Sequence, residues 1–175
     1  MRHLLLTGFP GCGKTTLVCR IIEQLRDLRL AGFYTQELRG EDGRRTGFQA
    51  IGLNGGSRTL ASVRSKSKIR VGRYGVELPG FEQLVDEELN REAGDVDLFV
   101  IDEIGKMECF SGAFVELVGK LLDGDAPVLA TVAMKGHGLI ADVKKRHDVE
   151  RITVHGGNRD RLVSDLVERI RSAAI

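Results

Sequence analysis

One segment near the N-terminus constrains the fold of this chain more than any other feature. Residues 8–15 read GFPGCGKT and match the pattern G-x-x-x-x-G-K-S/T. The apolar run Leu4 to Leu6 precedes the segment, and from Lys14 onwards apolar residues recur at helical spacing. A strand that leads through glycines into a helix is the context in which this pattern binds phosphate. The sequence therefore predicts a nucleotide phosphate site at this loop.

Each part of the loop has a physical role in holding phosphate. Glycines let backbone N–H groups turn inward around the anion, where a Cβ atom would collide. The following helix points its positive dipole end and its free N–H groups at the same charge. Lys14 is expected to reach the β- and γ-phosphates, and the Thr15 hydroxyl to bind Mg²⁺. We assign nucleotide binding to Gly8, Phe9, Pro10, Gly11, Cys12, Gly13, Lys14, Thr15 and Thr16.

Two alternatives apply to this loop. A glycine-rich turn can match the pattern by chance, but the flanking strand and helix argue against that interpretation. A helix N-terminus can activate a thiol, which would make Cys12 a redox switch. We favour the simpler role of Cys12 as a small side chain that fills the loop.

A second apolar strand is predicted to end in the acids that complete the site. The run Asp97 to Ile101 leads into Asp102 and Glu103, at the strand end where open α/β sheets bind ligands. Asp102 is expected to hold Mg²⁺, directly or through water. Glu103 is expected to orient and deprotonate the attacking water, a contribution of about 10² to 10⁴ in rate. The alternative role of Glu103 is to cap the segment that follows it.

Three further residues near the predicted site have open roles. Lys106 either stabilises charge in the transition state or is a solvated lysine. Glu37, at the end of the second predicted strand, either faces the γ-phosphate and its metal or is a solvent-facing hairpin acid. Thr131 either senses the γ-phosphate or the attacking water, or is a threonine at the edge of the core. We assign catalysis to Glu103, Lys14 and Lys106, and metal binding to Thr15, Asp102 and Glu37.

Asn158 and Arg159 open the last predicted helix, and both are assigned to nucleotide binding through contacts with the base. Asn158 is also a favourable N-cap residue, which is the role that we expect for it. The four histidines show no metal-ligand spacing. Mg²⁺ is therefore the only cofactor that the sequence predicts.

Apolar strands alternate with amphipathic helices along the rest of the chain. The spacing predicts helices over 14–29, 79–93, 113–122, 139–145 and 158–173. It predicts strands over 4–7, 32–38, 46–53, 57–62, 74–77, 97–102, 127–132 and 152–154. This order predicts one α/β domain over 1–175, with the P-loop NTPase fold: a mostly parallel sheet, helices on both faces, and an antiparallel β-hairpin insertion near residues 32–77.

Two helices are expected to bury particular faces. The periodicity assigns the first helix the buried residues Leu17, Ile21, Leu25 and Leu28. It assigns the helix over 113–122 the face Phe110, Phe114, Leu117 and Leu121.

Charge composition disfavours some function classes. The 175 residues carry 26 Lys and Arg against 25 Asp and Glu, a formal net charge of +1. This balance argues against a nucleic-acid coat protein and a membrane-surface protein. One basic run, residues 64–73, contains no acid. Apart from the neighbouring Tyr74 it lacks the aromatic residues of a stacking platform, so we favour a solvated basic face over RNA binding.

Cysteine usage and hydropathy indicate a compartment. Cys12, Cys19 and Cys109 lie at irregular spacing, which fits neither a disulfide framework nor a zinc site. Free thiols suit a reducing cytosol. The N-terminal apolar run is too short for a signal peptide, and no stretch approaches the roughly 20 apolar residues of a membrane span. We expect a cytoplasmic protein without a membrane partner.

From Leu4 to the last helix the chain resembles the THEP1 nucleoside-triphosphatase family. The resemblance includes the phosphate loop, GFYT at 32–35 followed by Glu37, RTGF at 45–48, VGRYGV at 71–76, Phe81-Glu82 and NRD at 158–160. Its most specific part is IDEIGKME at 101–108. Family members often carry a second acid where this chain has Gln36, and leucine where it has Cys109. The glutamine leaves Glu37 as the single acid at that position.

The resemblance implies a monomeric α/β enzyme with a catalytic glutamate beside the metal-binding aspartate. It also implies slow, Mg²⁺-dependent hydrolysis of several NTPs (ATP, GTP, CTP and UTP or TTP) to NDP and phosphate, with loose base preference. Two alternatives use the same loop: a nucleotide or small-molecule kinase, and an RNA-linked nucleotide switch that acts through residues 64–73. Because Glu103 directly follows Asp102, the sequence favours activation of water.

Overall fold

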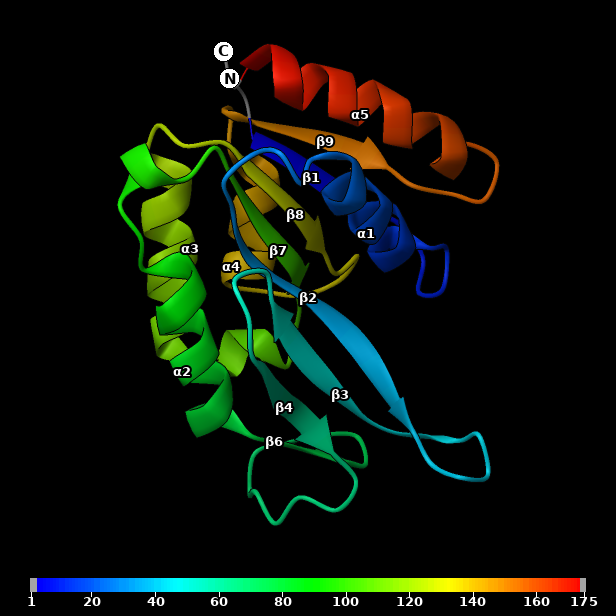
Figure 1. Cartoon of the computed structure of the whole chain (residues 1–175). Coiled ribbons are helices and arrows are strands. Elements are labelled where there is room, and N and C mark those ends of the chain that lie inside the picture. Colours follow the sequence, from blue (N-terminus) through cyan, green and yellow to red (C-terminus); the bar gives the residue numbers. More distant parts are fainter. Residues whose placement is uncertain (1–2, 174–175) are drawn as a thin grey trace.

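The computed structural model describes residues 3–173, so the outermost residues of the expected 1–175 unit lie outside the description. Within that range nine strands form one sheet in the order β5-β6-β4-β3-β2-β7-β8-β1-β9 (Figure 1). The strands are β1 (His3–Thr7), β2 (Leu30–Arg39), β3 (Arg45–Gly52), β4 (Ser57–Ser62), β5 (Arg70–Val71), β6 (Tyr74–Val76), β7 (Leu98–Ile104), β8 (Val128–Val132) and β9 (Val149–Thr153).

The sheet is mixed, with a parallel half and an antiparallel half. Strands β9, β1, β8, β7 and β2 pair in parallel. Strands β2, β3, β4, β6 and β5 pair antiparallel and form the insertion. The predicted α/β fold, with a parallel sheet and an antiparallel insertion, is therefore confirmed.

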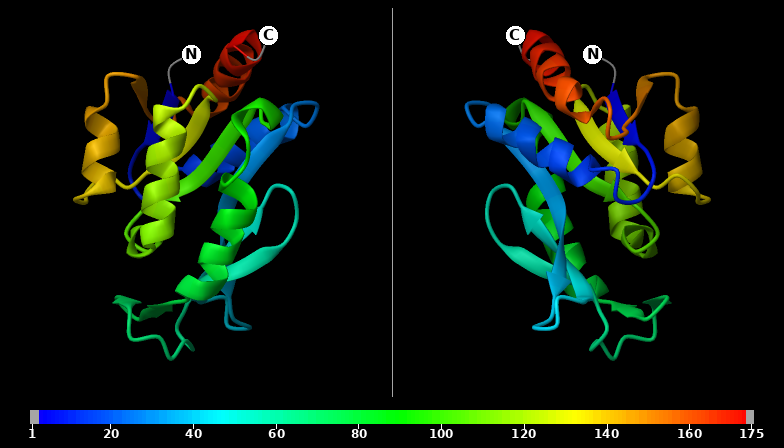
Figure 2. Two further views of the ribbon diagram at one scale, coloured as in Figure 1. Left: turned by 90° about the vertical axis from the view of Figure 1, so that its left-hand side faces the viewer. Right: turned by 90° about the vertical axis from the view of Figure 1, so that its right-hand side faces the viewer.

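Helices cover both faces of the parallel half, and Figure 2 views the sheet from each of these faces. The α-helices of the described range are α1 (Lys14–Gln24), α2 (Leu78–Leu89), α3 (Gly112–Asp123), α4 (Leu139–Asp142) and α5 (Arg159–Ala173). Short 3₁₀ turns are η1 (Ala93–Asp95), η2 (Glu108–Phe110) and η3 (Val143–Lys145). None of these helices has the length and apolarity needed to cross a membrane.

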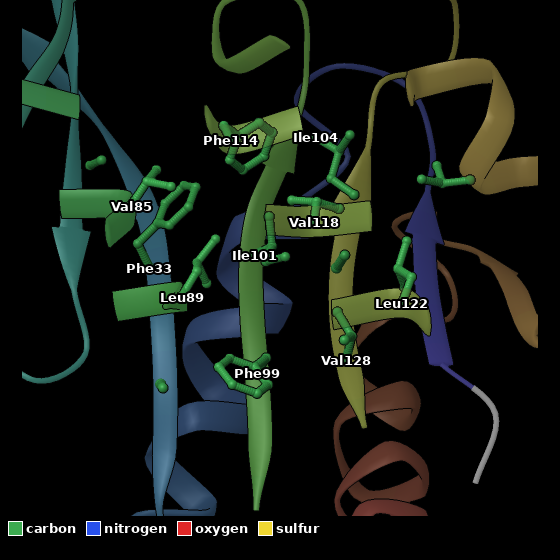
Figure 3. Close-up of a cluster of buried hydrophobic side chains, with 14 of the residues drawn as sticks. Phe33, Val85, Leu89, Phe99, Ile101, Ile104, Phe114, Val118, Leu122 and Val128 are labelled. Atoms are coloured by element: carbon green, nitrogen blue, oxygen red, sulfur yellow. The ribbon is translucent and has the colours of Figure 1, made fainter. Parts of the chain in front are cut away.

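Strand β7 lies at the centre of the core and is buried on both faces. Phe99 and Ile101 face the cluster formed with α2, α3 and α4 (Figure 3). Leu98 and Val100 face the opposite cluster, formed with α1 and α5. Successive side chains of a strand point to opposite faces, so a strand covered on both sides must be apolar throughout. This explains the continuous apolar run that leads to Asp102.

Strand β2 joins the two halves of the sheet. Its first residues, Leu30 to Phe33, pair with β7, and Phe33 to Arg39 pair with β3. Gly32 makes this contact possible, because a Cβ atom there would lie 1.9 Å from the carbonyl oxygen of Val100. The antiparallel arm thereby extends past the ends of β7 and β8 (Figure 1).

The buried face of α3 differs from the prediction. The buried residues are Phe114, Val118 and Leu122, whereas Phe110 is 41% exposed. The hydroxyl of Ser111 accepts a hydrogen bond from the N–H of Phe114 at 3.1 Å, so the helix begins after Phe110. Phe110 falls in the separate turn η2. The predicted Leu117 and Leu121 pack only at the edge of the core.

Two helices end at earlier residues than the apolar periodicity of the sequence predicts. Helix α1 ends at Gln24, not near residue 29, and α2 ends at Leu89, not near residue 93. Leu25 is nevertheless fully buried and Leu28 packs against the core. Apolar spacing reports burial, and residues in a turn that follows a helix can satisfy it without helical hydrogen bonds.

Candidate active site

The phosphate loop connects β1 to α1 at the carboxyl end of the parallel strands. Gly11 and Gly13 adopt φ values of 77° and 96°, which only glycine adopts without strain. A Cβ atom on Gly8 would lie 2.4 Å from the carbonyl oxygen of Val154. The amine of Lys14 donates a hydrogen bond to the carbonyl of Gly8 at 3.1 Å and so closes the loop. These contacts account for the glycines of the pattern.

Helix α1 begins without a side-chain cap. Gly13 stands at its N-cap position, no side chain accepts from the first turn, and no acidic residue occupies that turn. The free N–H groups and the positive helix end are therefore left for an anion. They open on a cavity of about 450 Å³, which we call the phosphate cavity, lined by Pro10, Gly11, Gly13, Lys14, Thr15, Thr16, Thr35, Gln36, Glu37, Phe48 and Glu103.

Asp102 is fully buried and is held from both neighbouring strands. The Thr131 hydroxyl on β8 donates to one carboxylate oxygen at 2.7 Å. The hydroxyl and the N–H of Thr35 on β2 donate to the other oxygen, at 3.3 Å and 3.4 Å. Thr131 thus contacts Asp102 directly. Thr35 was missed in the sequence, because only the pairing of β2 with β7 brings it to Asp102.

Glu103 lies at the wall of the phosphate cavity, together with Lys14 and Thr15. Its side chain is largely buried, and this burial raises the pKa of the carboxyl group. The positive charge of Lys14 partly opposes the shift, whereas the charge of Asp102 adds to it. A carboxylate with a raised pKa is a better proton acceptor than a solvated one.

Glu37 lines the same cavity but has other partners. Its two carboxylate oxygens pair with Arg39 at 2.6 Å and with Arg45 at 2.8 Å. The guanidinium of Arg45 also lies 5.3 Å from the ring centre of Phe48. This arrangement holds Glu37 in the antiparallel arm, and it gives no support to the predicted metal-binding role of Glu37.

The basic run predicted as a solvated face is partly used within the arm. Arg73 lies 5.2 Å from the ring centre of Tyr74, and its guanidinium donates to the carbonyl of Arg45 at 2.5 Å. The Tyr74 ring packs edge-on against Phe48 at 5.2 Å. The aromatic partner that the sequence lacked near Tyr74 therefore comes from β3, and the ring pair and its arginines brace the arm.

Asn158 and Arg159 lie next to the phosphate loop but differ in role. The Asn158 side chain accepts from the N–H of His155 at 2.9 Å and donates to the carbonyl of Thr153 at 2.8 Å. The side chain therefore braces the loop before α5. Asn158 stands at the position before the helix, where its carbonyl accepts from the N–H of Leu162 at 3.0 Å. Arg159 covers Gly13, where a Cβ atom would lie 2.8 Å from two of its side-chain atoms.

Arg159 carries a buried Nε–H without a hydrogen-bond partner among the described residues. The same nitrogen lies 3.6 Å from a carboxylate oxygen of Asp160, so an ion pair holds the guanidinium beside the phosphate loop. A guanidinium in this place can also donate to an anionic oxygen. The side chain of Cys12 packs against the core, and its sulfur lies 2.8 Å from where a Cβ atom of Gly8 would stand. That position fits the role of a small residue that fills the loop.

Lys106 and Glu108 follow the acidic strand end. Lys106 is exposed and lines a smaller cavity that Glu103 also lines. Glu108 is 6% exposed, and burial is the main cause that raises its pKa to about 8. Repulsion from Glu103 and Asp102 adds to the shift, and nearby backbone N–H groups oppose it. Sequence reasoning gave Glu108 no role, because nothing in the sequence marks it as buried.

Comparison with known proteins places this chain in a family. A family described as NTPase matches residues 3–167. A protein of Thermotoga sp. (strain RQ2) named nucleoside-triphosphatase THEP1 is 38% identical over 96% of this chain and 95% of its own length. The chain belongs to the THEP1 family of nucleoside-triphosphatases.

Further relatives are similar over nearly their whole length. The cancer-related nucleoside-triphosphatase homolog of Mus musculus is 40% identical over 98% of both chains. The crystal structure of THEP1 from Aquifex aeolicus superimposes with a TM-score of 0.87 at 35% identity, covering 96% of this chain and 98% of the other. The solution structure of a human cancer-related nucleoside triphosphatase gives a TM-score of 0.83 at 37% identity, covering 99% of both.

Proposed function

We propose that this chain is a Mg²⁺-dependent nucleoside-triphosphatase that converts NTP and water to NDP and phosphate. The observation that supports this function best is the position of Glu103. Its largely buried carboxyl group shares one cavity with the phosphate loop and with Lys14. A proton acceptor beside the γ-phosphate is what hydrolysis requires.

In the proposed reaction, Glu103 orients a water molecule and takes its proton as the water oxygen attacks the γ-phosphorus. The bond from the γ-phosphorus to the β,γ-bridging oxygen breaks, and that oxygen leaves with NDP. Lys14 and the free N–H groups of α1 stabilise the charge on the transferred group. Arg159, which lies over Gly13, adds a donor on the loop side.

The residues around Asp102 fit a magnesium ion. Mg²⁺ prefers oxygen ligands and is held by one or two carboxylates together with substrate phosphates and water. Asp102 supplies the carboxylate and Thr15 a hydroxyl, while Thr35 and Thr131 fix the carboxylate. Among the described residues no group of three or more His, Cys, Asp or Glu side chains forms a protein-only metal cage. When bound, Mg²⁺ neutralises charge on the β- and γ-phosphates.

The proposed enzyme has loose base specificity, because the residues of the site contact the phosphates of the substrate. The residues that line the phosphate cavity include the loop, the start of α1 and Glu103, all of which address phosphate. ATP, GTP, CTP and UTP share this phosphate group. The sequence also has no Asn-Lys-x-Asp motif for guanine.

Phosphate release from ATP, GTP, CTP and UTP tests the proposal, with and without Mg²⁺ and without any acceptor. We expect release from all four, dependent on Mg²⁺. Glu103→Gln removes the base and should lower the rate by about 10² to 10⁴. Lys14→Ala removes the amine that contacts the phosphates and should abolish phosphate release.

A matched control makes the same Glu→Gln substitution at a glutamate outside the phosphate cavity. Glu116→Gln alters an exposed glutamate on α3 that pairs with Lys120, and its rate should equal that of the wild type. Full activity of Glu103→Gln would refute the role of Glu103 as the base. Tight NTP binding without phosphate release by the wild type would refute hydrolysis itself.

A further inference from the structure

A second cavity, of about 290 Å³, adjoins Glu103 and is here called the acceptor cavity. Thr35, Phe48 and Glu103 line both this cavity and the phosphate cavity, so the two are neighbours. The acceptor cavity is otherwise formed by the antiparallel arm and by the segment after β7. Its remaining lining residues are Leu60, Val71, Gly105, Lys106, Met107, Glu108 and Ala133.

The acceptor cavity is larger than hydrolysis requires. One water molecule takes about 30 Å³ in the liquid, and a single water is the only second substrate of an NTPase. The walls are mainly apolar, with Phe48, Val71 and Met107 among them. Pockets for small organic molecules have this composition, with a few polar groups that fix orientation.

Besides Thr35 and Lys106, the polar groups that line this cavity are two neighbouring carboxyls, those of Glu103 and Glu108. A Cβ atom on Gly105 would lie 2.7 Å from a carboxyl oxygen of Glu108 and 3.0 Å from one of Glu103. Glycine at this position thus leaves room for both side chains. Burial raises the pKa of Glu108 to about 8, which favours its protonated form, and a protonated carboxyl group can donate a hydrogen bond.

We propose that the acceptor cavity binds a small, largely apolar alcohol, and that this protein transfers the γ-phosphoryl group of NTP to the alcohol oxygen. The proposal rests on the proposed function, because it uses the same base and the same phosphate site. The hydroxyl oxygen of the alcohol attacks the γ-phosphorus, and Glu103 takes the hydroxyl proton. The bond to the β,γ-bridging oxygen breaks, NDP leaves, and a phosphate monoester remains. Glu108 orients the alcohol by a hydrogen bond.

The test measures how the phosphoryl group divides between alcohol and water. The protein is incubated with ATP, Mg²⁺ and either benzyl alcohol or n-butanol, and ³¹P NMR separates the phosphate ester from inorganic phosphate. At about 50 mM against about 55 M water, an unbound alcohol would capture about one phosphoryl group in a thousand. We expect the ester to form in at least about one turnover in ten, an enrichment of about 100-fold.

Val71→Trp fills the acceptor cavity from the arm without touching the phosphate loop. We expect it to return the ester fraction to the level of an unbound alcohol while phosphate release continues. Val115→Trp, on a neighbouring cavity that shares only Lys106 with the acceptor cavity, is the matched control and should keep the wild-type ester fraction. Met107→Trp fills the acceptor cavity from a different segment and repeats the test if Val71→Trp does not fold.

The outcomes separate this proposal from the proposed function. Phosphate release without ester above the unbound level, for both alcohols, overturns phosphoryl transfer and leaves hydrolysis standing. Ester formation that survives both tryptophan variants overturns the assignment to this cavity. Failure of the proposed function itself would appear as NTP binding with neither phosphate nor ester.

Discussion

Replacing Thr131 by valine isolates the contribution of one buried hydrogen bond to the site. The two side chains have nearly the same shape, but valine cannot donate to Asp102. Both Thr131 and Asp102 are fully buried, so water cannot replace the lost donor. A hydrogen bond to a charged group contributes about 1.5 to 3 kcal/mol.

The expected loss of stability is therefore about 2 kcal/mol, which lowers Tm by about 4 to 8 °C in a chain of this size. In Thr131→Val, the carboxylate of Asp102 should also be less well oriented toward the metal. Loss of a group that orients a metal ligand typically costs about 10- to 100-fold in metal affinity or activity. The Mg²⁺ concentration for half-maximal phosphate release should rise by that factor.

Two assays check the prediction, thermal unfolding followed by circular dichroism and a Mg²⁺ titration of phosphate release. Thr131→Ser retains the hydroxyl and should keep most of the Mg²⁺ affinity. Thr59→Val makes the same change on the exposed side of β4 and should alter neither measurement. If Thr131→Val matched the wild type in both assays, the hydrogen bond would not hold Asp102. If Thr131→Ser were as impaired as Thr131→Val, packing rather than the hydroxyl would be responsible.

Three further predictions concern glycine and pH. Gly105→Ala should reduce phosphate release more than tenfold, because its Cβ atom would collide with the two carboxyls beside it, whereas Gly119→Ala, in open space on α3, should leave activity unchanged. Hydrogen bonds from Arg146 lower the pKa of Asp148 to about 2, so the ionised carboxylate stabilises the fold above about pH 4 and this contribution is lost toward pH 2. In Asp148→Asn, the free energy of unfolding measured in urea should not show this decrease between about pH 4 and about pH 2. Burial lowers the pKa of His3, so stability should fall as the pH drops below about 6.5, and His3→Phe should abolish that dependence.

The parts of the fold that were predicted correctly depend on local pattern. The phosphate loop was found because glycine conformations and the following helix are properties of neighbouring residues. The apolar run of β7 was found because burial on both faces removes the need for polar alternation. The face of α3 was misassigned, since the cap at Ser111 shifts the helix start and rotates Phe110 out of the core.

The contacts of Asp102 and Glu37 could not be predicted from the sequence. Thr35 and Thr131 reach Asp102 only because β2 and β8 flank β7 in the sheet. The sequence assigned Glu37 to metal binding, whereas in the structure Arg45 of β3 pairs with the carboxylate of Glu37. Strand order determines the first result, and the register between β2 and β3 in the predicted hairpin determines the second. A one-dimensional pattern specifies neither the order nor the register.

The sequence alone determined the phosphate loop, the acidic strand end, the α/β alternation and the family resemblance. Each of these is written in residues that are close together, where local sterics and hydrogen bonding act. Only the tertiary structure decided that two threonines fix Asp102, that Arg159 covers Gly13, and that Glu108 is buried beside Glu103. Those facts depend on contacts between distant segments, and such contacts exist only once packing has fixed the order of the strands.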